Sequence, residues 1–272
     1  MSEGGHEAAM AAEQEARVLT VKKATETIYS PEIERDNALR FGQREFTDEE
    51  ATALLAAIET MYDAKDLVED DEHLLPGEAR GNNASSMTYL FRDRKTSEKM
   101  LELVANKRIA GAWEKMKQDA GGDLQDTAWR FGQFLHKTSN LFSTMKDGMM
   151  ERSPREERKS LTIESEKALI DSKKALDALE KEIVAALTEI NDSNLRSKPS
   201  LTKYDSYGYD LDDMGFILAD TAAQIKVAGG DPEPLLDQAR RLFKTRDDKQ
   251  GRQLFDKKYE EMLTRVVFKG RG

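Results

Sequence analysis

Histidines and clustered carboxylates are the side chains of this 272-residue sequence that could move protons or bind a metal ion. The three histidines are His6, His73 and His136, and their surroundings contain no zinc-binding spacing such as HExxH. Four consecutive carboxylates, residues 69–72, stand in a strongly acidic stretch, where solvation of a charge run explains them without catalysis. We therefore predict no catalytic residue and no metal ligand among them.

Sequence motifs for nucleophilic catalysis and phosphate binding are missing. The chain has no cysteine, no G-x-S-x-G nucleophile elbow, and neither a GxGxxG nor a GxxxxGK phosphate loop. We expect a protein that is not an enzyme, that binds no cofactor and that has no evident small-molecule substrate. An enzyme of unrecognised type is the second alternative.

The segment DLDDMGFILADT, residues 210–221, is the best candidate for an ion site. It matches an EF-hand calcium loop at Asp210 and Asp212. It has Met214 where the loop needs an oxygen ligand and Thr221 where it needs a bidentate glutamate. The sequence favours a helix with Asp210 as its N-cap, so we predict no metal site here.

Helix signals follow one another along the chain from Ser30 onward and predict an all-α fold. Thr47 and Glu50 stand at capping-box spacing before an apolar run. The glycine pairs at 121–122 and 229–230 predict two helix ends. We expect an elongated multi-helix bundle.

Two apolar stripes at heptad spacing are the strongest periodic signal, and Gly148 and Pro154 separate them. We expect the helices 124–149 and 162–190 to pack antiparallel as a central coiled-coil-like hairpin. The first stripe consists of Leu124, Ala128, Phe131, Leu135, Thr138, Phe142, Met145 and Met149, and the second of Leu169, Ser172, Leu176, Leu179, Ile183, Ala186 and Ile190.

The tetrapeptide Arg-Phe-Gly-Gln occurs twice, around Phe41 and around Phe131, in otherwise different surroundings that indicate coincidence. The second copy places Gly132 inside the first heptad stripe. A glycine there costs about 1 kcal/mol relative to alanine unless it allows another backbone to come close. We therefore predict a contact site at Phe131 and Gly132.

Charge is unevenly distributed in a chain whose net charge is −10. Residues 45–78 hold twelve acidic side chains and one basic, whereas residues 240–271 hold eleven basic and five acidic. Two interpretations stay open: solvated helix faces, or salt-sensitive docking, either head to tail or onto another protein. Arg240, Arg241 and Lys244 are the partner-binding candidates of the basic end.

The N-terminal residues 1–29 and the loop 196–210 complete the organisation. The first is expected to be a flexible or extended arm, because it is rich in Gly, Ala and Glu and carries a β-branched patch at 18–29. The loop carries Tyr204, Tyr207 and Tyr209, a residue type common in protein contacts. The predicted segments are the arm 1–29, acidic helices 30–122, the heptad hairpin 123–195, the tyrosine-rich loop 196–210 and C-terminal helices with a basic end 211–272.

The chain lacks a predicted signal peptide, a membrane-spanning run and cysteine, which favours a cytoplasmic location. An isoelectric point near 5.1 argues against nucleic acid as a partner. We predict a non-catalytic structural or interaction subunit that contacts other protein subunits, by hetero-assembly or self-association, through the arm, the tyrosine-rich loop and the basic end. The less favoured alternative is a regulatory bundle that binds an anionic membrane or responds to an ion.

Overall fold

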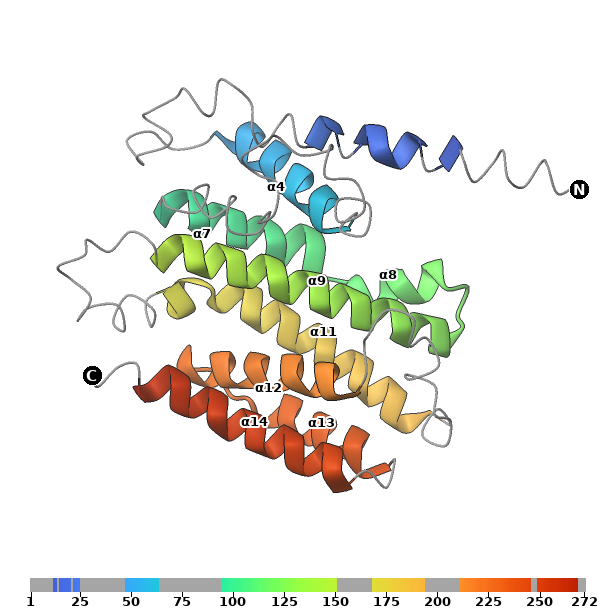
Figure 1. Cartoon of the computed structure of the whole chain (residues 1–272), viewed down its shortest axis with the longest axis vertical. Coiled ribbons are helices and arrows are strands. Elements are labelled where there is room, and N and C mark those ends of the chain that lie inside the picture. Colours follow the sequence, from blue (N-terminus) through green and yellow to red (C-terminus); the bar gives the residue numbers. More distant parts are fainter. Residues whose placement is uncertain are drawn as a thin grey trace, which may run out of the picture. The chain divides into compact units, whose positions relative to one another are not determined.

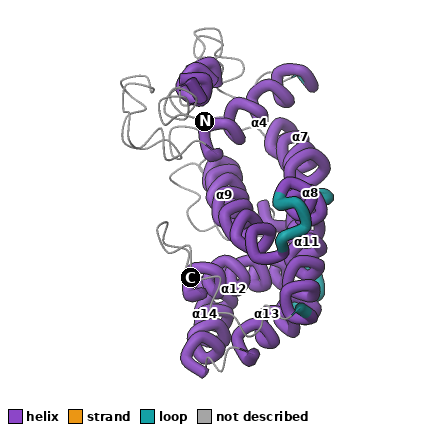
Figure 2. Tube along the Cα trace, turned by 90° about the vertical axis from the view of Figure 1, so that its right-hand side faces the viewer, coloured by secondary structure: helices purple, strands orange, loops and turns teal. Residues whose placement is uncertain are grey.

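The described part of the chain is helical, with loops and turns between the helices and no strand (Figure 2). The computed structural model describes residues 12–13, 15–20, 22–24, 47–63, 94–150, 168–193, 211–245 and 249–268. The helices with assigned bounds are α4 (Asp48–Asp63), α7 (Arg94–Leu103), the π-helix η3 (Val104–Ile109), α8 (Ala112–Asp119), α9 (Leu124–Met150), α11 (Lys173–Asp192), α12 (Leu211–Val227), α13 (Glu233–Thr245) and α14 (Lys249–Phe268) (Figure 1). The all-α prediction is confirmed. None of the described helices is both long and apolar enough to cross a lipid bilayer.

The chain forms two compact units. The first comprises Met1–Met100 and Asn140–Arg152, and the second comprises Leu101–Ser139 and Ser153–Gly272. These units cut across the five segments expected from the sequence, and that segmentation stays a prediction.

In the first unit, α4 begins at the predicted capping box. The backbone N–H of Thr47 donates to Glu50 Oε2 at 2.8 Å, and the N–H of Glu50 donates to Thr47 Oγ1 at 3.2 Å. These reciprocal bonds satisfy two backbone donors that a helix start leaves unpaired. The apolar face of α4 is buried at Leu54, Leu55 and Ile58.

Within the patch 18–29, which the sequence suggests is extended, the described residues 18–20 and 22–24 are helical, as are residues 15–17 before it. Alanine, glutamate, arginine and lysine dominate this stretch, and their helix propensity outweighs that of its few β-branched residues. Thr20 fits the helix because its hydroxyl donates to the carbonyl of Ala16 at 2.9 Å.

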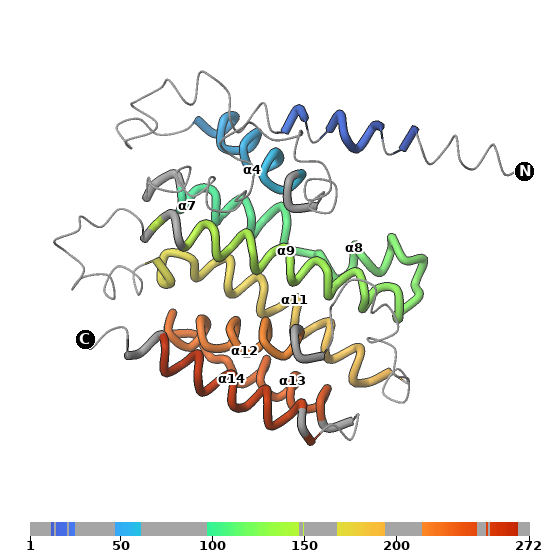
Figure 3. Tube along the Cα trace, in the orientation of Figure 1, coloured from blue at the N-terminus to red at the C-terminus, as the bar shows by residue number. Residues whose placement is uncertain are grey.

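In the second unit, α12, α13 and α14 follow one another as an up-down-up bundle, which Figure 3 traces along the chain. The ring of Phe243, near the end of α13, lies 5.5 Å from that of Phe255 in α14. A Cβ placed on Gly215, near the start of α12, would lie 3.1 Å from Phe243 Cζ. Glycine at this position therefore makes room for the aromatic ring at the centre of the bundle.

Both predicted double-glycine helix ends are confirmed. After α8, the N–H of Gly122 donates to the carbonyl of Lys117 and that of Gly121 to Gln118, and both glycines have positive φ. After α12, the N–H groups of Gly229 and Gly230 close the helix end in the same pattern. This pairing is a Schellman motif, which stops a helix at a left-handed glycine.

The second apolar stripe is buried at all seven positions, and the first is buried at its six positions from Ala128 to Met145. Ser172 interrupts the helix within the second stripe, because α11 begins only at Lys173. Helix α11 packs against η3, α8, α12 and α13, so its surroundings include more than one partner helix. The antiparallel coiled-coil hairpin stays a prediction.

Candidate functional site

The predicted partner-binding residues occupy three places in the chain. Tyr204, Tyr207 and Tyr209 lie outside the described residues. Helix α13 carries Arg240 and Arg241, together with Lys244, whose side chain is not described, and α9 carries Phe131 and Gly132. These residues of α9 and α13 belong to the second unit.

Arg240 joins two helices of its own bundle. Its Nε lies 3.4 Å from Asp256 Oδ1 of α14, and its Nη1 lies 3.7 Å from Glu233 Oε2 of α13. The side chain is 34% exposed. Its guanidinium is therefore shared with intramolecular carboxylates, which reduces the charge available to an external partner. Arg241, next to it, is exposed.

An acidic side chain of α14 forms ion pairs with two lysines of the same helix. Glu261 lies 3.8 Å from both Lys257 and Lys258. Lys258 also lies over the ring of Phe216 of α12, 5.5 Å from its centroid. Phe216 is 42% exposed, so an aromatic ring and a cation meet at the surface of the bundle.

Phe131 is a core residue of this chain, and its role as a partner contact stays a prediction. Its ring is fully buried, with the indole of Trp113 edge-on at 5.2 Å and the ring of Phe134 at 5.6 Å. Aromatic residues of the same unit therefore surround this position of the first heptad stripe.

Gly132 does not mark a close backbone approach. A Cβ placed on this residue would meet none of the described atoms within 4 Å. The residue is half-buried in the middle of α9, so its missing side chain has no packing role in the described structure. The expected contact of Gly132 with another chain stays a prediction.

The EF-hand-like segment belongs mostly to a continuous helix. Residues 211–227 form α12, in which Met214 and Thr221 are buried, and an open loop with converging oxygens is not formed there. Within the described residues, no group of three or more His, Asp or Glu side chains could hold a metal ion. Of the histidines, His6 and His73 lie outside the described part of the chain, and His136 is half-buried on α9.

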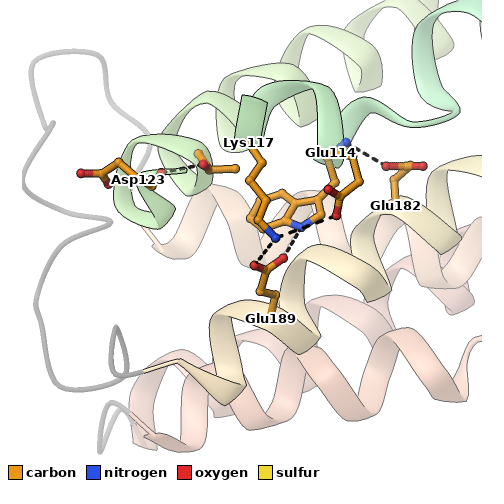
Figure 4. A network of polar contacts seen from close by, with 7 residues as sticks. Glu114, Lys117, Asp123, Glu182 and Glu189 are labelled. Carbon is orange, nitrogen blue, oxygen red and sulfur yellow. Dashed lines mark hydrogen bonds and ion pairs between the residues drawn. The ribbon is translucent and has the colours of Figure 1, made fainter. Parts of the chain in front are cut away.

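The most elaborate polar cluster of the described chain lies between α8 and α11 (Figure 4). Glu182 of α11 accepts the N–H of Gly111 on Oε1 and that of Trp113 on Oε2, each at 2.8 Å. A carboxylate distant in the sequence thus caps the start of α8, in the position that a helix dipole favours for negative charge.

Glu189, seven residues after Glu182 and therefore on the same face of α11, binds the other side of α8. Its Oε2 accepts the indole N–H of Trp113 at 2.7 Å, and its Oε1 lies 2.5 Å from Lys117 Nζ. Glu114 lies 4.0 Å from the same ammonium group. We call Glu182, Glu189 and their donors on residues 111–117 the α8 clamp.

The protonation states in the clamp follow from these contacts. The hydrogen bond from Lys117 holds the pKa of Glu189 below its ordinary value of 4.5, against a weaker opposing effect of burial. The same bond raises the pKa of Lys117. Both groups are therefore charged at neutral pH, and the clamp is a charge-assisted joint.

A second joint links η3 to α9 within the same unit. Arg108 of the π-helix donates from Nε to Thr138 Oγ1 at 3.2 Å and lies 5.7 Å from the centroid of the Phe134 ring. Thr138 is the one polar member of the first heptad stripe, and this contact gives its buried hydroxyl a partner.

The α8 clamp was not anticipated from the sequence. Glu182 and Glu189 are one heptad apart, and each directly precedes a residue of the second stripe. Heptad helices often carry interhelical charges at this position beside the apolar stripe. That spacing is a usable signal for the carboxylates. Their donors are backbone N–H groups and one indole, which carry no charge pattern that a sequence search could match to them.

The chain has no detectable similarity to known proteins in three comparisons. No family model matches it, and no significant match is found among curated proteins or among solved structures.

Proposed function

We propose that this protein is a non-catalytic helical subunit that contacts other protein chains. Its contacts would be made by the N-terminal arm, the tyrosine-rich loop and the basic C-terminal end. One observation carries the proposal. In the α8 clamp, both carboxylate oxygens of Glu182 and of Glu189 are bonded to donors of the fold itself, as expected for carboxylates with a structural role.

Engaged carboxylates suit a structural role better than a catalytic one. A general acid or base must reach the proton of a substrate and change its protonation state during the reaction. Glu189 instead has a pKa lowered by Lys117, which holds it in the charged form. Each oxygen of the two carboxylates is bonded to a donor of the fold, which holds both side chains in fixed positions.

Exposed side chains of α12, α13 and α14 are further candidate contacts. Phe216 and Lys258 lie together, and Arg241 is exposed on α13. Exposed aromatic and arginine side chains are the residue types that contribute most at protein interfaces. These residues supplement the tyrosine-rich loop as proposed contacts.

Purification of the native protein at physiological salt, with identification of co-purifying chains and measurement of the particle mass, tests this function. We expect a particle heavier than the monomer, from which Phe216→Ser releases the partner while Ile170→Ser, an exposed apolar control, does not. A monomer without any partner would contradict the proposal. Salt-sensitive flotation with liposomes of anionic lipid would favour the membrane-binding alternative instead.

A further inference from the structure

Helix α8 is attached to its unit by few residues. It is eight residues long, and its buried residues are Ala112 and Trp113. An isolated helix of this length is unstable in water, so its conformation depends on what holds it. The contacts that hold it therefore decide whether it is formed.

Left-handed glycines stand at both ends of α8. Gly111 has φ = 75° before the helix, and Gly121 and Gly122 have φ = 61° and 83° after it. A Cβ placed on any of the three would meet none of the described atoms within 4 Å, so their surroundings are not tightly packed, and hydrogen bonds of their N–H groups hold the backbone at these points. Element ends of this kind can absorb the backbone rotation of a hinge motion.

Between these glycines, the polar attachment of α8 to α11 converges on two carboxylates. Glu182 receives two backbone N–H groups, and Glu189 receives the indole N–H of Trp113 and the ammonium group of Lys117. We propose that α8 is a strap that detaches from α11 as a unit, pivoting at Gly111 and at Gly121-Gly122, while the α12–α14 bundle stays folded.

Detachment of the strap would uncover an aromatic surface. Trp113 is 2% exposed and lies edge-on to the fully buried Phe131, which also contacts Phe134. Removing α8 withdraws the indole and exposes these rings to solvent or to a partner. The strap thus goes beyond the proposed function, since it is a device within one unit that controls access to an apolar surface.

Hydrogen exchange of the full-length chain under native conditions tests the strap directly. We expect the hydrogen-bonded amides of Gly111, Trp113 and Lys115 to exchange at least roughly tenfold faster than the buried amides of α12, because local openings require less free energy than global unfolding. Equal exchange in α8 and α12 would overturn the proposal, since both would then open only by global unfolding.

The double variant Glu182→Gln with Glu189→Gln tests the role of the clamp. Each glutamine turns an acceptor oxygen into an NH₂ group that faces a donor, so exchange in residues 111–117 should rise roughly ten- to a hundredfold. Glu180→Gln, on the same helix but outside the clamp, should leave these amides unchanged. Unchanged exchange in the double variant, or an equal rise throughout the second unit, would contradict the proposal. If the double variant does not fold, the wild-type comparison of α8 with α12 decides.

Discussion

Helices α8 and α12 belong to the same unit but are fixed in different ways. Along α12, ten of the twelve residues from Met214 to Ile225 are buried, and the helix packs against α11, α13 and α14. Along α8, two residues of eight are buried, and the α8 clamp supplies directional, charge-assisted bonds. Helix α12 is held by the burial of apolar surface, and α8 is held mainly by a few hydrogen-bond donors and acceptors.

This difference determines how each helix can be released. Apolar burial is non-directional and is distributed over many contacts, so α12 is lost only when the bundle unfolds. A charge-assisted hydrogen bond depends on the ionisation and placement of single groups. Changes at α8 are therefore expected to be local, and changes at α12 global.

The largest effect is expected for Phe243→Ala in the α12–α14 bundle. Phe243 is buried against Phe255 and Gly215, and truncation of a buried phenylalanine costs about 3–5 kcal/mol of unfolding free energy. Phe216→Ala is the matched control; it removes an exposed ring and one cation–π contact, at a cost below about 1 kcal/mol. Urea denaturation measures both, and equal losses would contradict the assignment of Phe243 to the core.

The next effect is expected for Glu189→Gln in the clamp. Replacing this carboxylate should reduce the free-energy difference between attached and detached α8 by about 1.5–3 kcal/mol. This is the usual contribution of hydrogen bonds to charged groups. Acrylamide quenching of Trp113 emission, in a Trp129→Phe background, measures the change. Glu114→Gln removes an exposed charge 4.0 Å from Lys117 and should have less than about 1 kcal/mol of effect. Equal quenching in the two variants would show that Glu189 does not hold the indole.

Local helix signals explain why much of the fold could be predicted. The capping box at Thr47 and the helix end at Gly121-Gly122 each depend on neighbours in the sequence. The buried second stripe from Leu176 onward depends on the period of α11. These features are fixed by residue type and short spacing, without knowledge of distant contacts.

The features that could not be predicted depend on distant partners. Phe131 was correctly placed on an apolar stripe, but a stripe does not reveal whether its neighbour is Trp113 of the same chain or a residue of another chain. Glu182 caps a helix about seventy residues earlier, where no local motif marks a partner. The π-helix η3 widens one turn at 104–109, a change of register that helix propensity does not encode.

Two glycine substitutions give smaller, opposite effects. Gly132→Ala should stabilise α9 by about 0.5–1 kcal/mol, because a helical glycine is replaced where the described neighbours leave room for a Cβ. Gly215→Ala gains the same stabilisation from helix propensity but places a Cβ 3.1 Å from Phe243 Cζ. The free energy of unfolding should therefore fall, by up to about 2 kcal/mol. Thermal unfolding measures the pair, and stabilisation by both variants would mean that Phe243 can move aside.

The smallest effects concern two ionisable groups of α11 and have opposite signs. Glu189 has a pKa lowered by Lys117, so its contribution to stability is present above pH 4.5 and is lost as the pH falls through its folded pKa. Glu180 has a pKa raised by burial and by Asp177 and Asp231, so its contribution is present below pH 4.5 and is lost as the pH rises through its folded pKa. Glu180→Gln should therefore raise the melting temperature slightly at pH 7, and Glu189→Gln should lower it. A shift of the same sign in both variants would contradict these pKa directions.

The most direct test of the difference between α8 and α12 is a urea titration of the Trp129→Phe protein, followed by Trp113 fluorescence and by circular dichroism at the same time. Trp113 reports on the strap, whereas the dichroism signal comes from all helices and is dominated by the longer ones. We predict that the Trp113 transition precedes the loss of helix, because probes of a local and a global opening do not coincide. Superimposable transitions would contradict this account, since α8 and α12 would then be released in a single step.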